Sequence, residues 1–298
     1  MTKTLLKILV ITVCVVITNY NLSAANDRAR HQKINTQSAT VVESGHMEVD
    51  LNYLYIDQIG TKSGAFSNAF GTTRQTRSKM RYHQAMLAVT YGLMDTMDIT
   101  ARIGWADIKD RENPYGDSHG KGLTDLEITL KNVFYENEQG VRLAYVAGFG
   151  IPTGKASRTN HLRIGKKYWS FIQQLVLTRD INEQWTMNAD VGYRLPFGRT
   201  RDAYAPEFGR RMHKTRGTLD GNVALGYTGI DILQPVVELN YAHEFLKSDS
   251  GSDLLGFTLG AIVPLFDNHR LRVGVQRDFW GRNAVKSYTW SAGLTMAF

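Results

Sequence analysis

The chain ends in the sequence Trp290-Ser-Ala-Gly-Leu-Thr-Met-Ala-Phe298. Apolar residues occupy every second position of this stretch, from Trp290 to Phe298, and mostly small or polar residues lie between them. Successive side chains of a β-strand point to opposite faces of a sheet, so this alternation predicts a strand with one apolar face. We therefore expect the chain to end in a strand whose apolar face includes Phe298.

The same alternation recurs upstream, beginning at Gly45. The alternating segments are residues 47–55, 84–91, 97–105, 125–134, 142–149, 169–178, 185–194, 219–227, 233–245, 255–263, 271–278 and 289–298. Short turns near residues 92–96, 136–140, 180–184, 228–231 and 267–270 alternate with longer links at 58–76, 110–122, 152–166, 196–217, 247–253 and 280–286. Short turns on one side and long loops on the other are typical of barrels in the outer membrane of bacteria. We predict an all-β fold, a transmembrane antiparallel up-and-down β-barrel of about 12 strands over residues 45–298.

A soluble β-sandwich would also alternate, and the positions of the aromatic residues favour the membrane instead. Aromatic residues lie at both ends of the apolar stripes, as in the two interfacial belts of membrane barrels. The long-loop end has Tyr53, Tyr55, Trp105, Trp169, Phe171, Tyr193, Tyr241, Phe245, Phe257 and Trp290, and the short-turn end has Tyr91, Phe134, Trp185, Tyr227 and Phe298. The end of the chain is also similar to the signal that the barrel-assembly machinery reads, which makes Phe298 a candidate contact for that machinery.

The face opposite the apolar stripes carries many charges. A membrane barrel leaves no strand edge open, so these side chains would line a polar lumen. The predicted pore-lining residues are Glu48, Asp50, Asp98, Arg102, Asp125, Glu127, Lys131, Arg142, Asp190, Arg194, Asp220, Glu238 and Arg272, with Glu244 and Asp278 on the same face. Ten of these fifteen side chains are acidic and five are basic, so the lumen itself is not that of a simple anion channel.

The N-terminus has the features of a secretory signal peptide. Lys3 and Lys7 precede an apolar run over residues 8–17, and Ala25 ends a stretch of small residues that fits a cleavage site. We predict a cleaved signal peptide over residues 1–25 and a mobile, polar periplasmic tail over residues 26–44. The one cysteine, Cys14, lies within the signal peptide, so the mature protein would contain no disulfide.

Three motifs resemble those of the outer-membrane barrel family labelled for the MetA pathway of phenol degradation. They are Tyr91-Gly-Leu-Met-Asp95-Thr-Met-Asp98-Ile, Gly122-Leu-Thr-Asp125-Leu126-Glu-Ile128-Thr-Leu130-Lys131, and Ile151-Pro152-Thr153-Gly154. The second motif departs from the family pattern, because Gly120-Lys-Gly122 precedes two further residues before Asp125. The resemblance implies a membrane barrel that passes small molecules, including aromatic ones. The residues also allow a purely structural role, in which Pro152-Thr153-Gly154 is the rim of a strand and Asp125 pairs with Lys131.

No arrangement of residues points to an enzyme, a metal site, a cofactor or nucleic-acid binding. The histidines near the predicted long-loop end are His83, His119, His161, His213 and His243. Asp117, Ser118 and His119 are adjacent in sequence, so their side chains would point apart rather than form a catalytic triad. No two histidines have the spacing of metal ligands, and the mature chain has no cysteine.

The long loops are strongly basic, notably 152–166 and 196–217. Such loops would bind the anionic lipopolysaccharide surface or steer anionic solutes toward the mouth. We therefore expect an outer-membrane channel for passive passage of small solutes, with outer-membrane lipid and lipopolysaccharide as further partners. The alternative is a structural or surface-interaction barrel with a plugged lumen, which would bind lipopolysaccharide or a partner through these loops.

Overall fold

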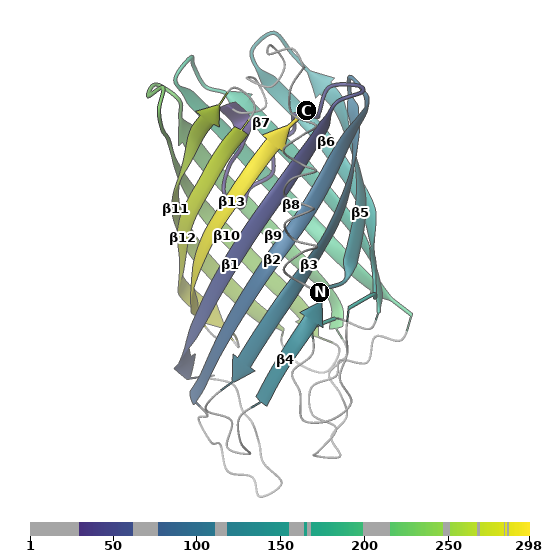
Figure 1. Cartoon of the computed structure of the whole chain (residues 1–298), viewed down its shortest axis with the longest axis vertical. Helices are drawn as coiled ribbons and strands as arrows, with labels where there is room; N and C mark the ends of the chain where they lie inside the picture. The colour runs from purple at the N-terminus through teal and green to yellow at the C-terminus, as the bar shows by residue number, and fades with distance from the viewer. Residues whose placement is uncertain are drawn as a thin grey trace, which may run out of the picture.

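The computed structural model describes residues 30–61, 77–110, 118–154, 164–165, 168–198, 215–246, 251–266, 269–282, 284 and 286–298. They form one antiparallel sheet that closes into a barrel (Figure 1). Its strands are β1 (Met47–Thr61), β2 (Arg77–Met94), β3 (Met97–Asp110), β4 (Ser118–Leu123), β5 (Leu126–Glu136), β6 (Val141–Ile151), β7 (Trp169–Asp180), β8 (Trp185–Phe197), β9 (Thr215–Tyr227), β10 (Gln234–Leu246), β11 (Ser252–Phe266), β12 (His269–Arg282) and β13 (Ser287–Ala297). In this part of the chain, no helix reaches the length and hydropathy of a membrane span.

The barrel has twelve strand positions, because two of the thirteen segments share one. Strand β3 pairs with β5 over its first half and with β4 over its second half, so β4 and β5 follow each other along the same neighbour. The predicted up-and-down barrel of about 12 strands is confirmed. Strand β4 lies within the link predicted at residues 110–122, and Gly120 and Gly122 interrupt any apolar alternation there.

The barrel closes where the two ends of the chain meet. Strand β1 pairs with both β2 and β13, and its register runs from Glu48 opposite Ala297 to Gln58 opposite Ser287. Met47 and Phe298 exchange two backbone hydrogen bonds at the short-turn end, with N···O distances of 3.0 and 2.8 Å. Phe298 therefore joins the end of the chain to the first strand and helps to close the barrel.

The outer wall is apolar, as expected for a surface that faces lipid. Leu51, Leu175, Val223 and Leu259 each expose between 45 and 55% of their surface. Aromatic side chains are exposed at both ends of this wall, including Trp105 at the long-loop end. Many large apolar residues at high exposure would be unfavourable in water, so the pattern agrees with the predicted lipid-facing stripes.

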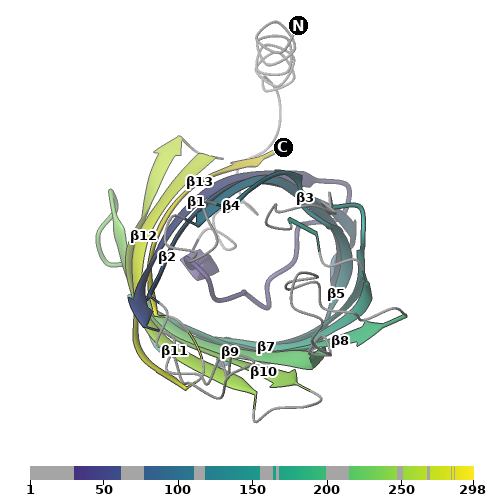
Figure 2. The same cartoon turned by 90° about the horizontal axis from the view of Figure 1, so that it is seen from below.

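The interior of the barrel contains residues 30–44, which we call the luminal segment. Figure 2 shows this purple segment inside the ring of strands. Several of its side chains are almost completely buried, including His31, Lys33 and Ala39. The prediction of a mobile tail is wrong for these residues, because their polar groups bind the polar inner face. The predicted signal peptide, residues 1–25, lies outside the described residues.

Candidate functional site

The luminal segment is held in place mainly by hydrogen bonds from the barrel wall. The most concentrated contact is Glu238 of β10, which is 1% exposed and points at a turn of the segment. Its Oε1 atom accepts hydrogen bonds from the backbone N–H groups of Ile34 at 2.8 Å and of Asn35 at 3.0 Å. Its Oε2 atom also accepts from Asn35, at 3.0 Å. A buried carboxylate surrounded by backbone donors replaces its lost hydration with strong, charge-assisted bonds.

Further along the segment, successive backbone groups bind different strands. The N–H of Gln37 donates to Asp190 of β8 at 2.8 Å, and the N–H of Val42 donates to Asp98 of β3 at 3.1 Å. Lys131 of β5 supplies the opposite charge and donates to the carbonyl of Thr40 at 2.8 Å. The donors and acceptors of the wall thus match those of the segment, so one conformation of the segment is specified.

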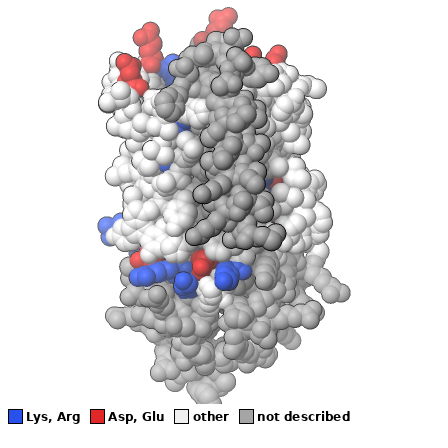
Figure 3. All heavy atoms as spheres, viewed as in Figure 1, with Lys and Arg blue, Asp and Glu red and all other residues white. Residues whose placement is uncertain are grey.

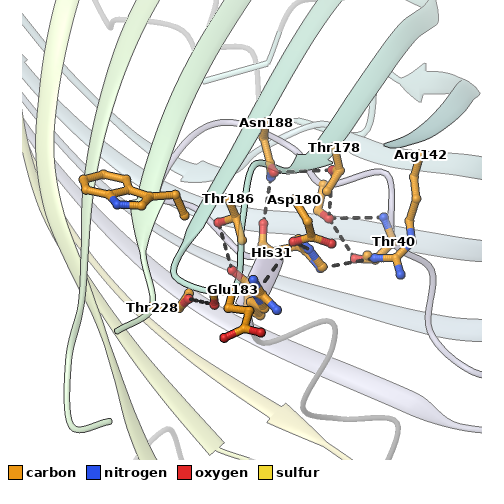
Figure 4. A network of polar contacts seen from close by, with 12 residues as sticks. His31, Thr40, Arg142, Thr178, Asp180, Glu183, Thr186, Asn188 and Thr228 are labelled. Carbon is orange, nitrogen blue, oxygen red and sulfur yellow. Dashed lines mark hydrogen bonds and ion pairs between the residues drawn. The ribbon is translucent and has the colours of Figure 1, made fainter. Parts of the chain in front are cut away.

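The start of the luminal segment is fixed at the short-turn end of the lumen (Figure 4). His31 is fully buried, and its Nε2 atom lies 2.8 Å from Oδ1 of Asp180 at the end of β7. Asn188 of β8 donates to the backbone carbonyl of His31 at 2.7 Å (Figure 4). Lys33 donates to the Oγ1 atom of Thr186 at 2.9 Å. Burial lowers the pKa of Lys33 to about 7, and Glu238 and Asp180 oppose this shift.

Apolar contacts add to this polar attachment at two places. Ile34 packs against the glycines of a cross-strand pair, Gly260 of β11 and Gly274 of β12. A Cβ atom at either glycine would lie 2.5 or 2.7 Å from the Ile34 side chain, so the two glycines leave the room that Ile34 occupies. Ala39 is the segment's contribution to a small apolar cluster with β6 and β7.

Gly92 gives the chain room to pass from the lumen into β1. A Cβ atom at Gly92 would lie 1.9 Å from the carbonyl oxygen of Glu43. Gly92 also donates its N–H to His46 and accepts from Gly45, at 3.0 and 2.9 Å. The Tyr91-Gly92 motif therefore has a steric function, since only glycine allows this close approach.

A second group of charges lies toward the long-loop end of the lumen. Arg194 of β8 contacts Glu127 of β5 at 2.6 Å and donates to the Oγ atom of Ser170 at 3.3 Å. Arg102 of β3 lies 3.9 Å from the same glutamate. These side chains remain partly exposed, with 41% for Arg102, 21% for Glu127 and 23% for Arg194. We call Arg102, Glu127 and Arg194 the mouth cluster, because solutes entering from that end would meet it.

Two of the family motifs, the one that contains Asp125 and the one formed by Pro152-Thr153-Gly154, meet beside the mouth cluster. Asp125 accepts a hydrogen bond from the N–H of Gly154 at 2.9 Å, and Thr153 accepts one from Leu126 at the same distance. The proposed pairing of Asp125 with Lys131 is wrong, because six strand residues separate them by roughly 20 Å. Lys131 instead lies 3.6 Å from Asp98. Pro152-Thr153-Gly154 is indeed at the end of a strand, β6.

Ion pairs also clamp the closing seam from inside. Arg270 of β12 reaches Glu48 of β1 at 2.8 Å, and Arg272 reaches Asp50 at 2.9 Å. Each arginine crosses over β13 to do so, and Gly293 leaves room for Arg272. Arg270 is 5% exposed and was missed from the sequence, because it lies in a predicted short turn.

The structure places eleven of the thirteen predicted pore-lining residues in three groups. Asp98, Lys131, Asp190 and Glu238 contact the luminal segment through its backbone. Glu48, Asp50 and Arg272 clamp the seam, and Arg102, Asp125, Glu127 and Arg194 lie toward the long-loop end. Arg142 binds Glu136 at 2.7 Å near the short turns, and Asp220 is half-buried on β9. The uncharged polar partners, such as Asn188 and Thr178, were missed because polar residues of this kind occur in any loop or strand.

The histidines near the long-loop end have structural partners. His119 lies 3.0 Å from Asp107, His83 lies 2.7 Å from the hydroxyl of Tyr53, and His243 lies 2.6 Å from Asp253. His161, His213 and Asp117 lie outside the described residues. Within the described ranges, no group of three or more metal-ligating side chains comes together.

A search of curated protein sequences finds no significant match. A family model labelled MetA-pathway of phenol degradation matches residues 35–294. The chain belongs to this family. The match covers residues 35–44 of the luminal segment and almost all of the barrel.

Solved structures with a similar fold include an outer-membrane channel and the membrane domains of two autotransporters. An outer membrane channel from Pseudomonas putida F1 superposes with a TM-score of 0.74 at 14% identity, over 89% of this chain and 100% of that chain. The β domain of the Bordetella autotransporter BrkA gives 0.56 at 15% identity, over 86% and 100%. The translocator domain of the autotransporter NalP from Neisseria meningitidis gives 0.51 at 12% identity, over 93% of both chains. At these identities, the likeness shows a shared fold.

Proposed function

We propose that this protein is an outer-membrane channel for passive passage of small solutes, and that the luminal segment controls that passage. The observation that carries the proposal is the way the segment is bound. It lies inside a polar lumen and is attached chiefly by hydrogen bonds, with few apolar contacts. Because water replaces each hydrogen bond on release, a bond contributes only about 0.5–1.5 kcal/mol net, or about 1.5–3 kcal/mol where one partner is charged. Such a segment can therefore leave the wall without unfolding the barrel.

Small organic molecules, aromatic ones among them, are the proposed solutes. The family label supports this class, and the Pseudomonas protein with the same fold is described as an outer membrane channel. The mouth cluster would select among these solutes. Because its positive and negative charges are paired, the passage there is polar but does not strongly favour anions over cations. A lumen of twelve strands is intermediate between a filled eight-stranded barrel and a wide porin, which favours small solutes.

The second candidate function is a plugged barrel that acts only through its surface. The burial of the luminal segment supports it directly. The two functions differ in whether any solute crosses the barrel.

Liposome swelling tests the proposal. Liposomes containing the full chain, or a variant lacking residues 30–44, would be exposed to neutral, anionic, cationic and aromatic solutes of similar size. The proposal predicts slow swelling with the full chain, faster swelling with the variant, and a preference for the aromatic solutes. If the folded variant admits no solute, the channel function is excluded and the plugged barrel is favoured.

A further inference from the structure

The outer wall carries an unusual row of charged side chains at the long-loop ends of β1 to β4. Figure 3 shows a row of blue side chains, with red ones among them, next to a wall that is mostly uncharged. The register places Asp57 opposite Arg81, Arg81 opposite Lys109, and Lys109 opposite His119. The next row toward the membrane contains His83, Asp107 and Lys121.

These side chains lie on the lipid side of the wall. Arg81 is an even number of residues from Leu87 on β2, and Lys109 is an even number of residues from Trp105 on β3. Side chains at such spacings share a face of the sheet, and Leu87 and Trp105 are exposed on the apolar wall. Trp105 lies in the aromatic belt. Along the strands, the row of Lys121 is two residues, or about 7 Å, beyond Trp105, and the row of Lys109 is four residues, or about 13 Å, beyond it. The headgroup layer begins at the edge of the hydrocarbon core and is about 5–7 Å thick on each side. The two charged rows therefore fall at and just beyond lipid headgroups.

The two rows contain three permanent cations but only two carboxylates. Asp57 is opposite Arg81 and Asp107 is opposite Lys121, which leaves Lys109 without an opposed carboxylate and the patch with excess positive charge. Arg81 and Lys109 occupy directly opposed positions on neighbouring strands, where like charges repel each other. Neither side chain forms an ion pair with another described residue, and the Nε atom of Arg81 is shielded from water with no hydrogen-bond acceptor in that part of the chain. Asp107 is already engaged by His119 at 3.0 Å. A multivalent anion that bridges Arg81, Lys109 and Lys121 would relieve the repulsion and supply acceptors.

We propose that this charged patch, formed by Arg81, Lys109 and Lys121, is a binding site for the phosphates of lipid A. If the long loops face outward, the patch lies in the outer leaflet, whose main lipid carries two phosphates on a diglucosamine with several acyl chains. The patch spans three strands, or about 10 Å, which suits a broad, diphosphorylated headgroup better than a phospholipid with one phosphate. The acyl chains would lie on the adjacent wall beside Trp105 and Leu123, which are 45 and 52% exposed. This site is independent of whether the lumen conducts.

The test uses the full chain purified in detergent and a double variant, Arg81→Gln with Lys109→Gln. The matched control is Arg179→Gln with Arg216→Gln, which also removes two positive charges. Arg179 lies on β7 at the short-turn end, and Arg216 lies on β9, away from the patch. Heat-modifiable gel migration would establish that each variant forms a barrel. Native mass spectrometry would then measure binding of diphosphoryl lipid A, monophosphoryl lipid A and phosphatidylglycerol.

We expect the full chain and the control to bind diphosphoryl lipid A equally, and more tightly than either other lipid. Each cation near an anionic lipid surface contributes roughly a fivefold effect, so the patch variant should bind about 10- to 30-fold more weakly. Equal binding by the patch variant and the full chain would overturn the site. An equal loss in the control, or equal affinity for phosphatidylglycerol, would overturn it as well, since binding would then reflect net charge alone.

Discussion

Replacing Glu238 by Gln tests how the luminal segment is held. The substitution keeps the size of the side chain but removes the charge and one of the two acceptor oxygens. The carboxylate now binds the N–H groups of Ile34 and Asn35 through three contacts of 2.8 to 3.0 Å. In Glu238→Gln, only one oxygen remains to accept hydrogen bonds from these donors. The new amide NH₂ group is itself a donor and cannot accept from the N–H groups that it faces.

The magnitude follows from the number of bonds lost. A hydrogen bond to a charged group contributes about 1.5–3 kcal/mol, and the equivalent of one to two such bonds is lost. Relief of the cost of burying a charge offsets part of this loss, which leaves about 2–3 kcal/mol. Because 1.4 kcal/mol corresponds to a factor of ten, release of the segment should become roughly 30- to 150-fold more frequent.

Hydrogen–deuterium exchange followed by mass spectrometry would measure this release. The informative amides are those of Ala39 and Val42, which bind Thr178 and Asp98 and have no contact with Glu238. Their exchange should accelerate by the same factor if the segment leaves as a unit. The control is Asp278→Asn, a lumen carboxylate that binds Ser287 at 2.9 Å instead of the segment. Unchanged exchange at residues 39–42 in Glu238→Gln would refute the idea that this carboxylate anchors the segment.

Three further predictions concern the same segment. Gly92→Ala should push residues 42–46 out of position at a cost of about 1–3 kcal/mol, visible as a lower unfolding midpoint in urea; an unchanged midpoint would contradict the steric argument. Gly274→Leu should fill the space of Ile34 and raise exchange of the segment, and adding Ile34→Gly should restore protection; no rescue would show that the two side chains do not compete. Because the pKa of Lys33 is about 7 in the lumen and 10.5 when released, raising the pH between these values should favour the bound segment by up to about tenfold per pH unit. Exchange measured at several pH values and corrected for intrinsic rates tests this, and Lys33→Met should remove the dependence if the lysine causes it.

Alternation predicted most of the barrel, because each outward residue must be apolar and each inward residue tolerates charge. The stripe from Trp290 to Phe298 thus predicted a strand and its lipid-facing side, and closure of the barrel makes β1 its partner. Strand β4 was missed because Ser118, Gly120 and Gly122 give no alternation. Pairing with β3, which is a property of the tertiary structure, makes this segment a strand.

The luminal segment could not be predicted because its sequence has no periodic pattern. Residues 30–44 are mostly polar, which is equally typical of a free tail, and their order comes from contacts with strand residues 49 to 263 positions away. The charged inner face was predicted correctly as a surface. The role of Glu238 depends on which backbone groups reach it, and sequence alternation carries no information about that. Gly92 could have indicated that the luminal segment packs against β2, since a glycine in an otherwise regular strand often marks a close approach of another backbone.

If the luminal segment obstructs a channel that the barrel would otherwise form, removing the segment should increase conductance. Single-channel recording in planar lipid bilayers would compare the full chain with a variant lacking residues 30–44. We expect small or infrequent conductance steps for the full chain and larger, longer-lived steps for the variant. Equal conductance of the full chain and a correctly folded variant would show that the segment does not obstruct a channel.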